Sequence, residues 1–357
     1  MNKIFNLFVL CAFLHTLPVE AQNFWKKIKE SEISLRDNST REIIPTQYQT
    51  FKVDLSGLRS HLLTAPMEFG GARNGEAFTV DMPSADGNIE TFIVYEAPVM
   101  ESGLAQKFRD IKSYKGYSTK TKLNQIRFAV SDRGVHAVIK SPSGEVYIDP
   151  YATNNATEHI TYYTKDHIDE SYKNISLCGV DATEKPDRQY FRPPGTRSAP
   201  AVEMRIYRAA VACTGEWGAR RGTVAACIAD INAMMTRLNM IYENELAVRF
   251  VLISENDKLI FLDGATDPYD TPTEGLKLVG SNTGKLNAII SSAAYDIGHV
   301  LSTCNDVGGV AQLGSLCQSN KGNGVTCHTS QSISVVVTRI VAHEIGHQFT
   351  ASHSWNS

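Results

Sequence analysis

The sequence lacks the charge excess, the repeats and the compositional bias that identify several large classes of protein. Its 357 residues carry a formal net charge of only −3, so no strong basic field favours binding to nucleic acid or to an anionic membrane. It contains no internal repeat and no low-complexity tract, which argues against a repeat array or a compositionally biased chain. What remains is ordinary globular composition, with 42% apolar and 20% charged residues. This length allows one large domain or two ordinary ones.

The first 21 residues have the pattern of a secretory signal peptide. Lys3 precedes an apolar run from Ile4 to Leu14, and Val19-Glu20-Ala21 places small or branched residues where a signal peptidase reads. The run is too short to anchor the chain stably in a bilayer. A buried N-terminal helix is the alternative. We predict a signal peptide over residues 1–21 and a secreted, extracellular protein.

Export changes what the cysteines are expected to do. Six of the seven remain after cleavage at Ala21, and in an oxidising compartment disulfides are their default state. Five of those six follow residue 200, and only Cys178 precedes it. The two halves of the chain therefore differ in cysteine usage.

The half before residue 180 is rich in β-strand signals and contains no histidine-rich or acidic cluster with the spacing of a metal site. His136 and His159 are isolated histidines, expected to be structural or exposed. A polar turn at Ser143-Gly144 predicts a β-hairpin. The strands are expected over residues 78–82, 90–95, 128–131, 135–140 and 146–149.

A Pro-rich segment, residues 184–200, separates the halves and is called the linker below. Its four prolines and single glycine cannot sustain a helix or a sheet. We read it as an exposed connection that proteases can cut, with an ordered surface loop as the alternative. Three arginines in it offer cleavage sites: Arg188, Arg192 and Arg197.

After the linker, strand and helix signals alternate, which indicates an α/β sheet. Apolar residues three or four apart predict a helix over residues 223–244, and its methionines are expected in a core. Gly- and Cys-rich turns are expected over 304–328, and a last helix from Ser334. The remaining elements are strands over 203–212, 247–253 and 295–301 and a short helix over 284–290.

Four chemically related side chains gather on and just after that last helix. His343 and His347 are four residues apart, so their imidazoles project from one face of the helix and can reach a common Zn²⁺. Glu344 lies beside the first, where a carboxylate can approach a metal-bound water without binding the metal. His353 lies six residues beyond His347, so the chain must turn sharply to bring it back.

The stretch HEIGHQFTASH resembles the metzincin signature, in which His-Glu-x-x-His-x-x-Gly-x-x-His binds catalytic zinc. Residues 295–327 look like the upstream part of the reprolysin (adamalysin-like) branch, and the resemblance covers about residues 200–357. It implies an α/β catalytic domain, with a twisted mixed sheet and an active-site helix, over residues 198–357. The β-rich half without visible chemistry and the cleavable linker after it separately predict a β-rich prodomain over residues 22–197, removed near the linker. By position, His343, His347 and His353 would bind one zinc ion, and Glu344 would be the catalytic base.

The resemblance also implies a substrate-pairing strand. In the family, the corresponding strand forms the sheet edge along which an extended substrate adds as a further strand. We expect His299, which lies on this segment, to be structural because the segment is not the ligand helix. The residues concerned are Tyr295, Asp296, Ile297, Gly298, His299 and Val300.

The sequence departs from the family in two respects. Thr350 stands where the family has a glycine, and a β-branched residue at positive φ costs about 1–2 kcal/mol. Metzincins also have a methionine turn beyond the third histidine, and no residue follows Ser357 here. We therefore expect the catalytic domain to be incomplete at its C-terminus.

Cys178 is a candidate for keeping such a protease silent. The segment Cys178-Gly179-Val180 resembles the cysteine-switch motif of matrixin propeptides, and a thiolate is a strong zinc ligand. On the metal it would occupy the position of the catalytic water. The alternatives are a disulfide to one of the five later cysteines or an inert buried thiol.

Taken together, these features predict a secreted zinc-dependent endopeptidase, made as a zymogen, in which Glu344 activates a zinc-bound water. Its partners would be protein or peptide substrates, with no nucleic acid and no stable membrane anchor. Oligomeric state and calcium binding stay open. Two alternative functions also remain. One is a gluzincin-type protease, with a downstream glutamate as third ligand. The other is a non-catalytic secreted binding module that zinc only stabilises.

Overall fold

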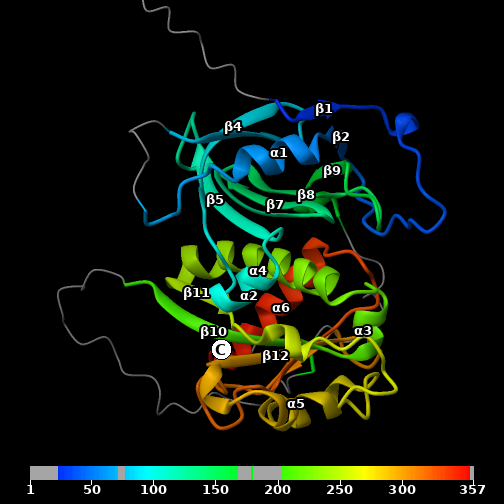
Figure 1. The fold of residues 1–357 in the computed structure, drawn as a ribbon, viewed down its shortest axis with the longest axis vertical. Helices are drawn as coiled ribbons and strands as arrows, with labels where there is room; N and C mark the ends of the chain where they lie inside the picture. Colours follow the sequence, from blue (N-terminus) through cyan, green and yellow to red (C-terminus); the bar gives the residue numbers. More distant parts are fainter. Residues whose placement is uncertain (1–22, 71–76, 168–177, 180–202, 354–357) are drawn as a thin grey trace, which may run out of the picture.

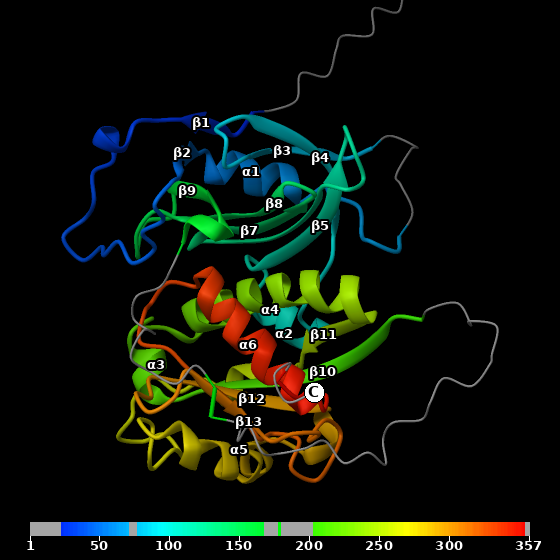
Figure 2. The same cartoon turned by 180° about the vertical axis from the view of Figure 1, so that it is seen from behind.

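The computed structural model describes residues 23–70, 77–167, 178–179 and 203–353. The predicted signal peptide and the linker lie outside these residues. The described chain forms an N-terminal unit (residues 23–167) stacked on a C-terminal unit (residues 203–353), with the long helix α4 (Val224–Leu246) between their sheets (Figures 1 and 2). Within this described part, no helix combines the length and apolar character needed to cross a membrane.

The N-terminal unit is built on a nine-stranded sheet in which every neighbouring pair is antiparallel. Its order is β1-β2-β9-β8-β7-β6-β5-β4-β3. The strands are β1 (Trp25–Lys27), β2 (Gln49–Val53), β3 (Thr79–Pro83), β4 (Ile89–Glu96), β5 (Lys112–Ser118), β6 (Gln125–Ser131), β7 (Gly134–Ser141), β8 (Gly144–Pro150) and β9 (Glu158–Tyr163). The helical segments are η1 (Glu30–Glu32), α1 (Leu55–Leu62), α2 (Ser102–Lys107) and η3 (Thr164–Asp166).

Local sequence explains much of this sheet. The hairpin predicted around Ser143-Gly144 joins β7 to β8, and Gly144 has a φ of 122°, which a side chain would disfavour. Helix α1 buries Leu58 and Leu62 against the sheet. His136 and His159 are both buried. The Nδ1 atom of His136 lies 2.9 Å from Asp149 Oδ1, and His159 accepts a hydrogen bond from the Val135 amide.

The C-terminal unit is an α/β layer with a mixed five-stranded sheet of order β11-β10-β12-β14-β13. Four strands are parallel and β13 is antiparallel to β14. Helices α4 and α6 cover one face and α5 the other (Figure 1). The elements are β10 (Arg205–Cys213), α3 (Gly215–Ala219), β11 (Val248–Leu252), η6 (Asn256–Leu259), α5 (Gly275–Ile289), η7 (Ser292–Ala294), β12 (Ile297–Ser302), β13 (Gly309–Ala311), β14 (Gly324–Cys327) and α6 (Val335–Gln348).

Helix α4 begins where its sequence indicates and ends two residues later than expected. The Thr223 hydroxyl caps the first turn by accepting from the Ala226 amide, and Ala247 closes the last turn in the left-handed conformation. Both faces of the helix are covered, because one packs on the N-terminal sheet and the other on the C-terminal sheet. Its methionines lie in the core, as expected: Met234, Met235 and Met240 are at most 3% exposed.

Two expectations for the C-terminal unit are wrong. Residues 304–328 are not only turns, because the short strands β13 and β14 lie there and the Cys304–Cys327 disulfide joins the region. Helix α5 begins at Gly275 rather than near residue 284. Its three glycines lower helix propensity and conceal its first turns from a pattern search.

Candidate functional site

Helix α6 is held by one apolar face, which leaves the opposite face to present histidines. The Ser334 hydroxyl caps its N-terminus, accepting from the Val337 amide at 3.4 Å. Val341 and Ile345 are each 2% exposed in the core shared with α4. On that side the Tyr242 hydroxyl also donates to the Ala342 carbonyl at 2.7 Å.

The chain reverses immediately after α6. Thr350 has a φ of +76°, and its amide donates to the His347 carbonyl at 2.9 Å. Phe349 anchors the turn among aromatic rings, with centroids 5.4 Å from Tyr207 and 5.9 Å from Phe250. The turn predicted at Thr350 is thus present, in a backbone conformation that favours glycine.

As a result, three histidine rings converge. The Nε2 atom of His343 lies 3.0 Å from that of His347 and 3.2 Å from that of His353. Ligand nitrogens on a tetrahedral zinc, with bonds of about 2.0–2.1 Å, are about 3.3 Å apart. His347 Nδ1 lies 2.7 Å from the Ala351 carbonyl, so it carries the proton and leaves Nε2 as the free lone pair. The donor set therefore fits a zinc ion.

The environment of these rings favours the neutral imidazole that a metal requires. His343 is exposed at its surface, but partial desolvation of its ring, helped by the two neighbouring rings, lowers its pKa to about 4. Burial also lowers the pKa of His347, although its hydrogen bond to the Ala351 carbonyl acts in the opposite direction.

Glu344 is fully buried beside this cluster. Burial raises the pKa of its carboxyl to about 8, and the nearby Cys178 thiol acts in the opposite direction. A Cβ at Gly309 would lie 2.6 Å from Glu344 Cγ, so the backbone of β13 passes directly over this side chain. Sequence reasoning missed Gly309, and the Gly308-Gly309 pair was the only signal for it.

The fourth donor comes from outside the C-terminal unit. The Cys178 Sγ atom lies 3.3 Å from His347 Nε2, and the four donor atoms all lie within 4.8 Å of one another. A thiolate and an imidazole on one tetrahedral zinc would be about 3.6 Å apart. Cys178 is thus at the cluster and is not part of the Cys304–Cys327 disulfide.

Residues 178–179 also lie on the edge of the sheet. The Gly179 amide donates to the Gly309 carbonyl at 2.8 Å. A Cβ at Gly179 would be 2.9 Å from Leu276 Cδ2 and 3.1 Å from Val307 Cγ1, so this contact is close. The edge strand beside the histidines is therefore β13.

The expectation that Tyr295, Asp296, Ile297, Gly298, His299 and Val300 form that edge is wrong. Strand β12 pairs with β10 on one side and β14 on the other, so its main chain is already hydrogen-bonded. Strand order depends on contacts between distant segments, which the local pattern does not record. His299 is buried within the sheet, 2.9 Å from the Thr326 hydroxyl, and burial lowers its pKa to about 4.

One known protein family matches the C-terminal part of the chain. The family model described as metallo-peptidase family M12B, reprolysin-like, matches residues 203–357. Among solved structures, metalloproteinase-II from Bacteroides fragilis aligns with a TM-score of 0.46 and 10% identity, over 84% of this chain and 85% of that one. No curated protein has a significant sequence match to the chain.

Proposed function

Because residues 203–357 belong to the reprolysin-like M12B family of metallopeptidases, we propose that this protein is a zinc-dependent endopeptidase with its active site at α6. The observation that carries the proposal is the convergence of three Nε2 atoms beside one buried carboxyl group. A site with three protein ligands keeps a position for chemistry, whereas a purely structural zinc site is usually closed by four.

His343, His347 and His353 would hold the zinc. When bound, the ion would polarise a peptide carbonyl and lower the pKa of a water molecule. Glu344 would accept a proton from the attacking water and deliver it to the leaving amine. The bond between His347 Nδ1 and Ala351 holds that ring in orientation and fixes its tautomer.

Strand β13 would bind the substrate backbone. It is the edge strand beside the histidines, and its Gly309 carbonyl already accepts from the Gly179 amide. An extended peptide could take the place of residues 178–179 and pair with the same main-chain groups. Protein or peptide substrates are therefore the proposed partners.

The decisive experiment compares Glu344→Gln with the parent protein. We expect the variant to retain one zinc per molecule and to lose nearly all cleavage of casein, because a proton carrier is removed and no ligand. Glu255→Gln, at a side chain 43% exposed, is the matched control and should leave both properties unchanged. Wild-type cleavage by Glu344→Gln would contradict the role of Glu344. Zinc binding without peptidase activity in any form of the protein would favour the binding module.

Secretion and latency complete the proposal. Residues 1–21 would direct export, and residues 22–197 would form the propeptide. Support for latency comes from the position of Cys178, whose thiolate would take the place that a reacting water needs. N-terminal sequencing of the secreted fragment that carries α6 should begin between about residues 189 and 203. A secreted fragment that carries α6 and begins at Gln22 would contradict the propeptide.

The latency proposal has its own test. The uncleaved precursor carrying Cys178→Ser should cleave casein, whereas the parent precursor should not. Cys317→Ser replaces an exposed cysteine and should remain latent. If the Cys178→Ser precursor bound zinc but cleaved casein no faster than the Cys317→Ser precursor, the propeptide would block the cleft without using Cys178.

A further inference from the structure

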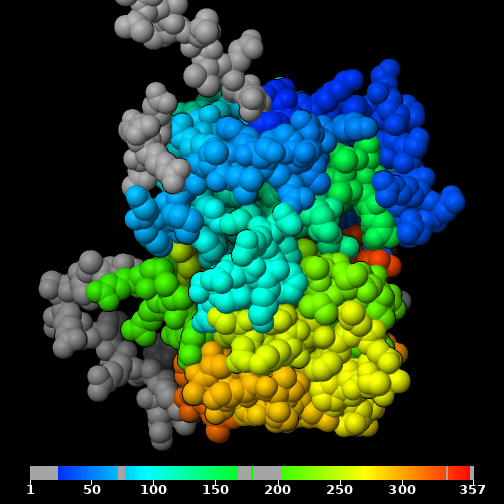
Figure 3. All heavy atoms as spheres, viewed as in Figure 1, coloured from blue at the N-terminus to red at the C-terminus, as the bar shows by residue number. Residues whose placement is uncertain are grey.

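A segment of the N-terminal unit completes the core of the C-terminal unit. This docking segment, residues 99–111, connects β4 to β5 and contains α2. Its buried side chains belong to one hydrophobic cluster with α4, α6, β10 and β11. In Figure 1 helix α2 lies at the level of α4, below the sheet whose strands precede and follow it in the chain, and Figure 3 shows this cyan segment spanning the boundary between the two units. The side chains are Val99, Met100, Leu104 and Ile111, each at most 6% exposed.

The docking segment also covers a sheet edge. Strand β11 is the last strand in the order of its sheet. Its Leu252 amide donates to the Val99 carbonyl at 2.8 Å, and the Glu101 amide donates to the Leu252 carbonyl at 2.8 Å. The Glu101 carboxylate then accepts from both the amide and the hydroxyl of Ser254. Without this segment, β11 would expose unpaired main-chain groups.

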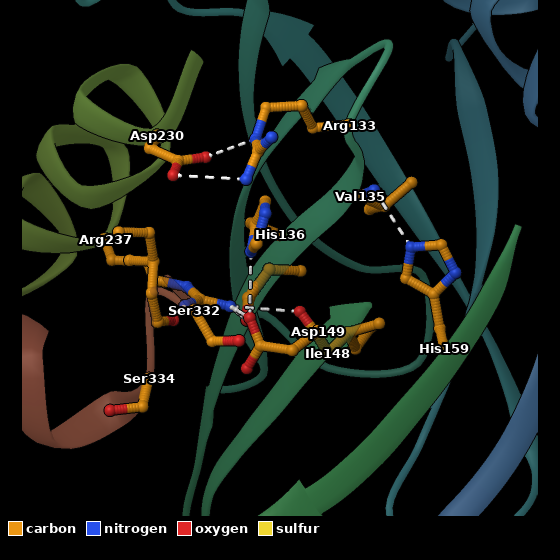
Figure 4. Close-up of polar contacts among 12 residues, drawn as sticks. Arg133, Val135, His136, Ile148, Asp149, His159, Asp230, Arg237, Ser332 and Ser334 are labelled. Carbon is orange, nitrogen blue, oxygen red and sulfur yellow. Dashed lines mark hydrogen bonds and ion pairs between the residues drawn. The ribbon is translucent and has the colours of Figure 1, made fainter. Parts of the chain in front are cut away.

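Buried charges cross the same boundary. Arg237 of α4 has a fully buried side chain and donates to Asp149 Oδ1 at 2.6 Å and to the Ala137 and Ile148 carbonyls (Figure 4). Burial alone would raise the pKa of Asp149, but Arg237 and His136 hold it below its usual value. Within the C-terminal unit, Arg237 also donates to the Ile333 carbonyl.

Further ion pairs flank Arg237 on both sides. Arg133 reaches Asp230 of α4 at 2.7 Å, as Figure 4 shows. At the other end, Arg249 of β11 makes a two-bond contact with Glu68 at 2.7 and 2.8 Å, and both side chains are under 10% exposed. Removing one partner from a buried ion pair is strongly unfavourable, because the remaining charge stays away from water.

From these contacts we infer that the N-terminal unit is a lasting partner of the C-terminal unit and not a segment shed when the linker is cut. Cleavage within residues 184–200 leaves a two-chain complex held by the docking segment and the buried ion pairs. The surface on the C-terminal unit is the β11 edge with the adjoining face of α4, and its partner is this chain's own N-terminal unit.

Latency of the cut protein, which rests on the proposed function, follows from the position of Cys178. Cys178 precedes the linker, so it remains with the N-terminal fragment after the cut. The two-chain complex therefore keeps residues 178–179 on β13 and stays latent. Activity requires a second event that displaces or degrades the N-terminal unit.

The main test cuts the full-length chain at an inserted recognition sequence for a specific protease, placed within residues 184–200. Size-exclusion chromatography at submicromolar concentration should show both fragments in one peak, separating only in denaturant. Elution of the N-terminal fragment apart from the C-terminal one would overturn the inference, whether the latter stays folded or aggregates. This result does not depend on peptidase activity.

Variants of the cut complex test which contacts hold it. Glu101→Gln and Arg237→Met should each speed dissociation of the fragments at least about tenfold. Each weakens charged contacts across the boundary, which are half-buried at Glu101 and fully buried at Arg237. Lys140→Met is the matched control. Lys140 pairs with Glu245 across the same boundary, but both side chains are more than one third exposed. Equal dissociation of all three variants and the parent would contradict the role given to these contacts.

Activity assays separate this inference from the proposed function. The cut complex should be inactive on casein, and the cut complex with Cys178→Ser should be active. Activity of the cut parent complex equal to that of the Cys178→Ser complex would overturn the latency of the complex. If the fragments co-elute and no form cleaves casein, even after proteolytic removal of the N-terminal fragment, docking stands and the peptidase proposal fails.

Discussion

Gly309 of the edge strand β13 lies directly over Glu344 of α6. A Cβ at position 309 would be 2.6 Å from Glu344 Cγ and 2.7 Å from its Oε1 atom. Real Cβ atoms do not approach so closely, so any larger residue must push the carboxyl group aside. The glycine therefore fixes where Glu344 can lie relative to the three histidines.

Gly309→Ala should lower casein cleavage by about 100-fold, because a displacement of about 1 Å at a reacting group costs that much. Zinc content should not change, since no ligand moves with Glu344. Gly284→Ala is the matched control. Nothing lies within 4 Å of a Cβ there, and the exchange removes a helix glycine from α5. Full activity in Gly309→Ala would show that Glu344 has room to shift.

Thr350→Gly should stabilise the protein by about 1–2 kcal/mol, because the φ of +76° no longer opposes a side chain. The urea concentration at the midpoint of unfolding should rise, and the slope of the unfolding free energy against urea concentration should not change. Thr329→Gly, at an exposed residue outside the positive-φ set, should instead lose stability, since glycine adds freedom to the unfolded chain. A loss of stability in Thr350→Gly would mean that contacts of the threonine side chain outweigh the backbone strain.

Arg237→Met should destabilise the intact chain by about 3–5 kcal/mol, because it leaves Asp149 buried without its main cation. Lys140→Met should change stability by less than about 1 kcal/mol, since its ion pair with Glu245 is exposed. Chemical denaturation of both variants gives the comparison. Similar losses in the two variants would contradict the importance assigned to burial.

Stability should fall as the pH drops from about 6.5 towards 4, partly through His159. Burial, and then the neighbouring His136, lower the pKa of His159 to about 4, whereas an unfolded histidine titrates near 6.5. Between these values the unfolded chain binds a proton that the folded chain does not, so acid favours unfolding. The neutral ring is needed because its Nε2 accepts from the Val135 amide.

His159→Gln tests this pH dependence, since its amide oxygen can accept the same bond without titrating. The difference in unfolding free energy between pH 7 and pH 4.5 should be smaller in the variant than in the parent by about 2–3 kcal/mol. An identical pH dependence in both proteins would show that other groups account for the acid sensitivity.

Features carried by contiguous residues could be predicted from the sequence. The i, i+4 spacing of His343 and His347 places both rings on one helical face, whatever surrounds the helix. Caps at Thr223 and Ser334, the Ser143-Gly144 hairpin and the turn at Thr350 likewise depend on a few neighbouring residues.

Strand order, the edge beside the histidines and the boundary between the two units were decided only by the tertiary structure. Strand β12 gave a clear local signal but lies inside the sheet, while three residues in a Gly-rich stretch form its edge. A charged helix residue such as Arg237 is ordinarily expected to face solvent. In the fold it is buried and forms an ion pair with Asp149, which is 88 positions away in the sequence. Such pairings join residues far apart in the chain, and their free energy comes from burial that only the assembled fold creates.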